Sequence, residues 1–145
     1  MFIHCTITAN TATQFGGALF DTSTSNVTIT NCIIWNNGTT PVYNNTGGTA
    51  TVTYSSLEYS ITGTGNRVGT PLFANAADLD GADNIWRTAD DGLRLLSTSL
   101  CIDKGLNSAV PVGVTTDITG APRIVDGPDA DATATVDMGA YEDQN

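Results

Sequence analysis

The stretch Asn26-Val27-Thr28-Ile29-Thr30-Asn31-Cys32-Ile33-Ile34-Trp35-Asn36-Asn37 decides the fold, because similar stretches precede and follow it in the chain. Residues 2–10 align with it at an offset of 27 residues, and residues 52–58 align at an offset of 23 residues. A period of this size is typical of a parallel β-solenoid, in which each turn buries its apolar face by stacking on its neighbours. We therefore expect stacked parallel strands at these three places.

The apolar positions within the repeat predict which side chains point inward. Val27 and Ile29 alternate as they would on one face of a strand. A left-handed backbone conformation at Asn31 would shift the alternation of inward and outward side chains, so that Cys32 and Ile34 also point inward. Asparagine tolerates that conformation. Stacking then predicts three ladders of equivalent side chains: Cys5, Cys32 and Ser55; Ile7, Ile34 and Leu57; Asn10 and Asn37. A disulfide between Cys5 and Cys32 would be awkward between in-register parallel strands, so we expect stacked thiols.

The repeats end near Gly69, and the rest of the chain has a different character. The sequence predicts an all-β domain in which residues 1–69 form about three solenoid coils and residues 70–145 form an irregular C-terminal cap packed onto them. Prolines interrupt regular structure in this second part. They are Pro71, Pro111, Pro122 and Pro128. The apolar side chains expected to cover the last coil are Leu93, Leu95, Leu96, Leu100 and Ile102.

The second part opens with an acidic loop, Asp78-Leu79-Asp80-Gly81-Ala82-Asp83-Asn84-Ile85-Trp86-Arg87-Thr88-Ala89-Asp90-Asp91-Gly92. Carboxylates held this close repel each other, and a hard divalent cation with oxygen ligands offsets that cost. Gly81 permits the chain to turn back with a positive φ. We expect Ca²⁺ to be bound by Asp78, Asp80, Asp83 and Asp90, with Asp91 behind them, a carbonyl near Ile85 completing the shell and Trp86 covering it. The alternative is a solvated acidic surface loop.

Composition excludes several classes of partner. The net charge is −10 with five Lys and Arg residues among 145, which argues against nucleic acid and anionic membrane surfaces. No run of eighteen apolar residues is present, so the sequence predicts no membrane span. His4 stands alone, and the three cysteines match no zinc-binding pattern. Cations and neutral polymers remain as partners.

Further stretches carry a resemblance to a known family. They are Gly69-Thr70-Pro71-Leu72-Phe73, Asp90-Asp91-Gly92-Leu93-Arg94-Leu95, Ser99-Leu100-Cys101-Ile102-Asp103-Lys104-Gly105, Asp117-Ile118-Thr119-Gly120-Ala121-Pro122-Arg123 and Val136-Asp137-Met138-Gly139-Ala140-Tyr141-Glu142. Together with the repeats, they resemble the C-terminal part of bacterial right-handed parallel β-helix repeat proteins with a choice-of-anchor type region. The resemblance implies a right-handed β-helix closed by a cap. It also implies an extracellular or cell-surface protein whose signal and anchor lie outside this chain.

Two functions follow as expectations from this resemblance. The first is a non-catalytic, calcium-stabilised module that binds carbohydrate or serves as a structural element of the cell surface. Its aromatic side chains available to stack on sugar rings are Trp35, Tyr43, Tyr54 and Tyr59. The second is a fragment of a calcium-dependent polysaccharide lyase or glycosidase of pectate-lyase-like fold.

The repeats argue for the non-catalytic reading. Up to Gly69 they hold Arg67 as their only Lys or Arg and Asp21 and Glu58 as their only carboxylates, too few to place an acid and a base at one site. Arg87 is the sole lyase-like candidate, and pairing with a neighbouring aspartate explains it equally well.

Two contacts complete the expectations. Asp117 and Arg123 are candidates for an ion pair that holds the cap, and Asp137 and Glu142 are candidates to join it.

The strand region from Phe2 to Thr8 would present an unpaired edge, which predicts a homodimer through this region. A monomer with a frayed first coil is the alternative.

Overall fold

The computed structural model describes residues 1–22, 24–45, 47–128 and 131–144. Its strands are β1 (Phe2–Ile3), β2 (Thr6–Thr8), β3 (Leu19–Asp21), β4 (Asn26–Thr30), β5 (Ile33–Trp35), β6 (Val42–Asn44), β7 (Thr49–Thr53), β8 (Ser56–Leu57) and β9 (Arg67–Val68). One short 3₁₀ helix, η1 (Asn107–Ala109), follows them. The prediction of an all-β chain is confirmed.

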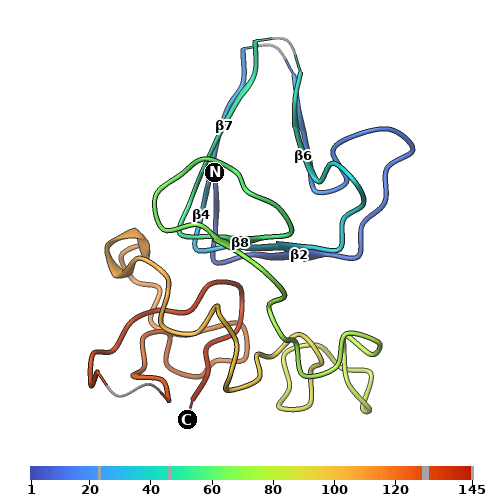
Figure 1. The fold of residues 1–145 in the computed structure, drawn as a ribbon. Coiled ribbons are helices and arrows are strands. Elements are labelled where there is room, and N and C mark those ends of the chain that lie inside the picture. Colours follow the sequence, from blue (N-terminus) through green and yellow to red (C-terminus); the bar gives the residue numbers. More distant parts are fainter. Residues whose placement is uncertain (23, 46, 129–130, 145) are drawn as a thin grey trace.

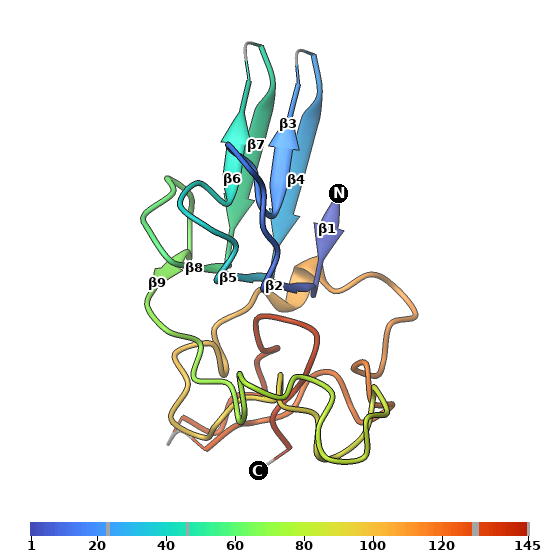
Figure 2. The ribbon, with the colours of Figure 1, turned by 90° about the vertical axis from the view of Figure 1, so that its right-hand side faces the viewer.

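All strand pairs are parallel and fall into three sheets, ordered β1-β4-β7, β2-β5-β8-β9 and β3-β6. Figure 1 shows the strands of successive repeats lying over one another, and Figure 2 shows them side by side. Ile3 pairs with Thr30, which pairs in turn with Thr53. These partners are 27 and 23 residues apart, so the register read from the sequence is confirmed. We call β1–β2, β4–β5 and β7–β8 the first, second and third repeats.

The turn between the two strands of each repeat has the left-handed conformation predicted at Asn31. His4, Asn31 and Tyr54 occupy equivalent positions with φ values of 53°, 53° and 47°. Ala9 and Asn36 repeat this behaviour at the next corner, with φ values of 58° and 56°. Left-handed backbone is costly for residues with a Cβ, so its recurrence means that the stacked neighbours hold each corner in place.

The predicted ladders form, and hydrogen bonds run along them. The Cys5 N–H donates to Cys32 Sγ (3.4 Å), and the Cys32 N–H donates to Ser55 Oγ (3.1 Å). Asn66 continues this ladder by accepting the Ser55 N–H (3.2 Å). In the asparagine ladder, Asn37 Oδ1 accepts both the backbone N–H and the side-chain amide of Asn10. Each corner side chain therefore fixes the backbone of the repeat before it. All three cysteines are free thiols in the structure.

The apolar core lies inside the three repeats. Its fully buried members are Ile29, Cys32, Ile34, Val52 and Leu57. Strand side chains alternate between faces, so Ile33 points the other way from Ile34. Ile33 belongs to a second cluster with Cys101 and Met138, both from the C-terminal segment (residues 70–145).

The position predicted for the C-terminal segment is wrong. It packs against the outer face of the β2-β5-β8-β9 sheet instead of closing the end of the last coil (Figures 1 and 2). Leu95 and Leu100 join the cluster around Ile33, while Leu96 is exposed. Residues 61–66 lie against the third repeat instead, with Ile61 on the core and Asn66 Nδ2 donating to the Val52 carbonyl (2.9 Å). Ile33 and Trp35 supply an apolar outer face, and this explains why the segment settles there.

Across the described ranges, no helix has the length and apolar character needed to cross a membrane.

Candidate functional site

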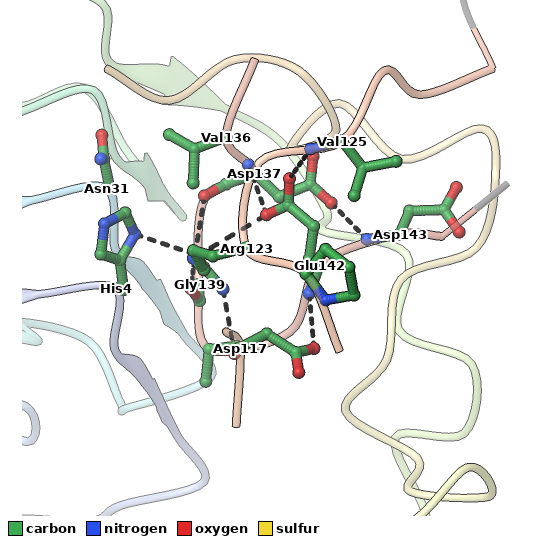
Figure 3. Close-up of polar contacts among 12 residues, drawn as sticks. His4, Asn31, Asp117, Arg123, Val125, Val136, Asp137, Gly139, Glu142 and Asp143 are labelled. Carbon is green, nitrogen blue, oxygen red and sulfur yellow. Dashed lines mark hydrogen bonds and ion pairs between the residues drawn. The ribbon is translucent and has the colours of Figure 1, made fainter. Parts of the chain in front are cut away.

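Arg123 is the centre of a buried polar cluster that joins the C-terminal segment to the first repeat (Figure 3). Its Nη2 donates to His4 Nδ1 (2.8 Å) and to the carbonyls of Asp137 (3.1 Å) and Gly139 (2.6 Å). Its Nη1 donates to the Ala140 carbonyl (3.1 Å). The guanidinium thus fastens the turn at residues 137–140 and holds it against the corner residue of β1.

The carboxylates around Arg123 bind mainly backbone N–H groups. Asp137 Oδ1 accepts from the N–H of Asp103 (2.8 Å), and its Oδ2 accepts from the N–H of Asp143 (2.7 Å). Glu142 Oε2 accepts from the N–H of Asp137 (3.0 Å) and lies 3.8 Å from Arg123 Nε. Buried carboxylates bound in this way organise irregular backbone that has no strand partners.

The ion pair expected between Asp117 and Arg123 is replaced by one between Glu142 and Arg123. Asp117 Oδ2 instead accepts the Glu142 N–H (3.1 Å), and its Oδ1 accepts the N–H groups of Thr119 and Ala121. Asp117 therefore shapes a turn and positions the glutamate. The expectation that Asp137 and Glu142 join the cluster is confirmed.

Burial shifts the protonation of this cluster. Desolvation raises the pKa of Asp137 to about 7 and, together with the nearby Asp137, raises the pKa of Glu142 to about 8. Desolvation followed by the charge of Arg123 lowers the pKa of His4 to about 4. His4 is thus neutral at pH 7 and accepts from the guanidinium at Nδ1. Together these contacts hold two parts of the chain together, and they leave the acids and the arginine occupied by structural bonds.

The acidic loop is a compact series of turns, with Gly81 at a φ of +72° as predicted. Asp90 Oδ2 accepts the Asp83 N–H (3.2 Å), and Asp90 Oδ1 accepts from Thr88 Oγ1 (2.7 Å). Asp83 Oδ1 accepts the Ile85 N–H (2.8 Å). These bonds to the loop's own donors lower the pKa of Asp90.

Asp91 bonds the backbone of its own loop and a residue near the end of the described chain. Its side chain is fully buried, and Oδ2 accepts from the N–H groups of Arg87 (2.7 Å) and Thr88 (3.1 Å) and from the Tyr141 hydroxyl (2.6 Å). The other oxygen, Oδ1, is buried without a hydrogen-bond partner. Tyr141 was not anticipated as a partner, because nothing local in the sequence links positions 50 residues apart.

The loop does not form a ready-made metal centre. Within residues 1–22, 24–45, 47–128 and 131–144, no three or more His, Cys, Asp or Glu side chains group in a way that could hold a metal ion. Asp78 and Asp80 are partly buried, whereas Asp83 and Asp90 are exposed. Calcium binding would require the loop carboxylates to turn toward one another. Trp86 and Ile85 are both exposed, so neither covers a site in this arrangement.

Arg87, the lyase-like candidate, is exposed on the far side of the same loop and has a left-handed φ of 75°. It lines a cavity of about 330 Å³ whose other charged lining residues are Arg94, Asp117 and Glu142. Arg94 Nη1 donates to the Ala89 carbonyl in the cavity wall. The cavity separates Arg87 from the repeats, which supply none of its lining residues.

An exposed aromatic surface lies on the two-stranded sheet β3-β6. Phe20 and Tyr43 are paired across the strands, and their rings stack with centroids 5.4 Å apart. Phe15 stacks on the other side of Tyr43 at 4.4 Å, with the ring planes 13° apart. Phe15 and Phe20 are 44% and 48% exposed. We call Phe15, Phe20 and Tyr43 the aromatic patch.

The sequence of β3 and β6 explains why these rings face solvent. Leu19 and Val42 pack against the core, so alternation turns Phe20 and Tyr43 outward. Gly16, with a φ of +74°, brings the chain back close to Phe20 and so places Phe15 beside the sheet. Only Tyr43 was anticipated among these three. The phenylalanines were missed because no repeat marks their segment.

The other aromatic residues proposed for sugar stacking have different positions. Trp35 packs against the cluster formed with the C-terminal segment and is partly buried. The ring of Tyr54 lies against Gly65. Tyr59 is 38% exposed and donates to the Gly38 carbonyl (3.2 Å).

Comparisons of the chain with protein-family models, with curated proteins and with solved structures returned no match.

Proposed function

We propose that this chain is a non-catalytic extracellular module built on the end of a right-handed parallel β-helix, and that it binds neutral carbohydrate. The parallel register and the stacked corners of residues 1–69 support the β-helix. The observation that carries the binding proposal is the aromatic patch, in which the exposed Phe15 and Phe20 stack on the partly buried Tyr43.

The chemistry of the patch favours a neutral sugar chain. Aromatic faces pack against the C–H faces of sugar rings, and the Tyr43 hydroxyl adds a polar group at the edge. The only charged side chain on β3 or β6 is Asp21, which is buried, so the surface offers no cation for an acidic polymer. The net charge of −10 further disfavours anionic ligands.

Among the residues that the structure describes, β3 and β6 carry a single carboxylate, Asp21, and no acid–base pair, which supports binding without cleavage. Asp137, Glu142 and Arg123 are engaged in joining the C-terminal segment to the repeats. General acid and base catalysis needs two groups within hydrogen-bonding reach of one substrate position. Arg87 lines a separate cavity and therefore cannot serve a ligand held on β3-β6.

An oligosaccharide array followed by calorimetry tests this function. Neutral oligosaccharides are expected to bind, and Phe20→Ala and Tyr43→Ala to weaken binding at least tenfold. Trp86→Ala is the matched control, because Trp86 is equally exposed but lies in the acidic loop. Binding lost in Trp86→Ala and kept in Phe20→Ala would contradict the assignment. Release of shorter products, abolished by Arg87→Ala, would instead identify a lyase or glycosidase.

We also propose that the acidic loop binds Ca²⁺ through Asp78, Asp80, Asp83 and Asp90. Four carboxylates within one short loop support a cation there, because a hard divalent ion offsets their mutual repulsion. A cation that binds only the folded chain stabilises it by about 2.7 kcal/mol at a hundredfold excess over its dissociation constant. Thermal melts should therefore differ between calcium and chelator. Identical melting temperatures in calcium and in chelator, with no heat of calcium binding, would contradict the calcium site and indicate a solvated acidic surface loop.

A further inference from the structure

The first repeat lies at one end of the corner ladder. Along the corner ladder, each side chain accepts the backbone N–H of the preceding repeat: Cys32 from Cys5, Ser55 from Cys32 and Asn66 from Ser55. Among the residues that the structure describes, no backbone N–H donates to Cys5 Sγ. Strands β1 and β2 likewise pair on one side only (Figure 2). Cys5 is therefore the solvent-facing end of the ladder.

Cys5 and Cys32 are positioned as direct neighbours. The pairs Ile3–Thr30 and Thr6–Ile33 flank them in register, so the two cysteines face each other across adjacent repeats. Neighbouring strands are about 4.8 Å apart. A disulfide spans Cα separations of roughly 4.4–6.8 Å, which includes this spacing. The Cys5 N–H donates to Cys32 Sγ at 3.4 Å, so the Cys32 sulfur already lies against Cys5, and a change of rotamer at the partly exposed Cys5 would bring the two sulfurs together.

We propose that Cys5 and Cys32 form a reversible disulfide that fastens the first repeat to the second in an oxidising environment. Such environments favour disulfides in extracellular proteins. The bond would close the whole loop between the two corners and restrict the unfolded chain.

The reaction is thiol–disulfide exchange with a small-molecule disulfide such as oxidised glutathione. The partly exposed Cys5 attacks first as its thiolate, forms a mixed disulfide and releases one glutathione thiolate. Cys32 then loses its proton, attacks Cys5 Sγ and releases the second glutathione. Two protein thiols become one disulfide, and one glutathione disulfide becomes two glutathione thiols. A hydrogen bond from Cys32 lowers the pKa of Cys5, which favours this order.

The third cysteine provides a matched control. Cys101 is fully buried like Cys32, but it packs with Ile33 on the opposite face of the sheet. It therefore cannot reach either corner cysteine. Serine is the appropriate replacement in the ladder because Ser55 already occupies the equivalent corner and accepts the same N–H bond.

The test uses the whole chain, equilibrated in glutathione buffers of increasing oxidising strength and then unfolded for thiol counting and mass measurement. The wild-type chain is expected to pass from three free thiols to one with the loss of two hydrogens. Cys101→Ser should pass from two thiols to none. Cys5→Ser and Cys32→Ser should keep Cys101 reduced and form no internal disulfide.

Protection of the first repeat provides a second readout. Amide hydrogens of residues 2–10 should exchange more slowly in the oxidised wild-type chain than in the reduced chain, whereas oxidant should leave exchange in Cys32→Ser unchanged. The proposal is overturned if the wild-type chain keeps three thiols in fully oxidising buffer. Disulfide-linked pairs of chains through Cys5, or an internal disulfide in Cys32→Ser, would overturn it equally.

Discussion

Asn31 combines a backbone role and a side-chain role at one fully buried position. Its left-handed φ of 53° turns β4 into β5, and its side chain bonds the Leu106 backbone twice, donating to the carbonyl (3.1 Å) and accepting from the N–H (2.8 Å). The sequence predicted the first role from the phase shift of the apolar pattern. It could not predict the second, because Leu106 lies 75 residues away in a segment without repeats.

Asn31→Ala should lower the free energy of unfolding by about 3 kcal/mol. Two buried hydrogen bonds contribute about 1 kcal/mol each, and a left-handed alanine costs about 1 kcal/mol. Asn36→Ala is the control, because Asn36 has nearly the same φ but is exposed. It should cost about 1 kcal/mol, the conformational part alone. Urea unfolding measures both, and equal losses would show that the contacts to Leu106 add nothing.

Asp137 and Glu142 should make the fold less stable as pH rises above neutral. Their pKa values in the folded chain, about 7 and about 8, lie above their ordinary values, so the folded chain holds more protons than the unfolded chain. The free energy of unfolding therefore falls as the pH rises toward and through the pKa values of these two groups in the folded chain. His4 has a lowered pKa and acts in the opposite direction, but only between about pH 4 and its ordinary value of 6.5.

His4 does not contribute between pH 6.5 and 8. Over this range we expect the free energy of unfolding to fall by about 1–2 kcal/mol. Chemical unfolding at closely spaced pH values measures it. Glu142→Gln should flatten the profile in this window, whereas Glu58→Gln, which replaces a carboxylate on the repeats, should leave it unchanged. A wild-type profile that is flat or rises across the window would contradict the buried cluster.

At the scale of elements, the parallel pairing of the repeats could be predicted from the sequence, whereas the third sheet, β3-β6, could not. Equivalent residues such as Cys5, Cys32 and Ser55 marked the register, because each repeat must bury the same positions. Strands β3 and β6 carry no such mark, since Leu19 and Val42 share only their apolar character. The third sheet and the aromatic patch on it therefore emerged only from the folded structure.

Among the described residues, β1 and β2 pair on one side only, and a homodimer of this chain through that edge is a proposal. Residues 2–8 carry no carboxylate and no Lys or Arg, so two acidic chains can meet there without direct repulsion. Such an edge exposes backbone donors and acceptors along with the apolar Phe2. We expect a homodimer through Phe2 to Thr8 in light scattering at tens of micromolar, dissociated by Ile3→Lys. A monomeric mass, unaffected by this substitution, would indicate a frayed first repeat instead.

At the scale of the whole molecule, the C-terminal segment runs along the side of the repeats. It bonds His4 in the first repeat through Arg123, and Asn31 in the second through Leu106 and through the Gly139 N–H. The sequence suggested a lid because solenoid ends need covering. Its apolar residues carried no information on which face they would cover, and in the structure they pack on Ile33 and Trp35.

The central claim is that residues 70–145 and the repeats form one cooperative unit through this lateral packing. Native-state hydrogen exchange, followed by mass spectrometry in low denaturant, tests it most directly. Amides that bond across the junction, those of Leu106, Gly139 and Ala140, should open with the same free energy as those of β4 and β5. Exchange of the junction amides at a much lower free energy, while β4 and β5 stay protected, would contradict the account.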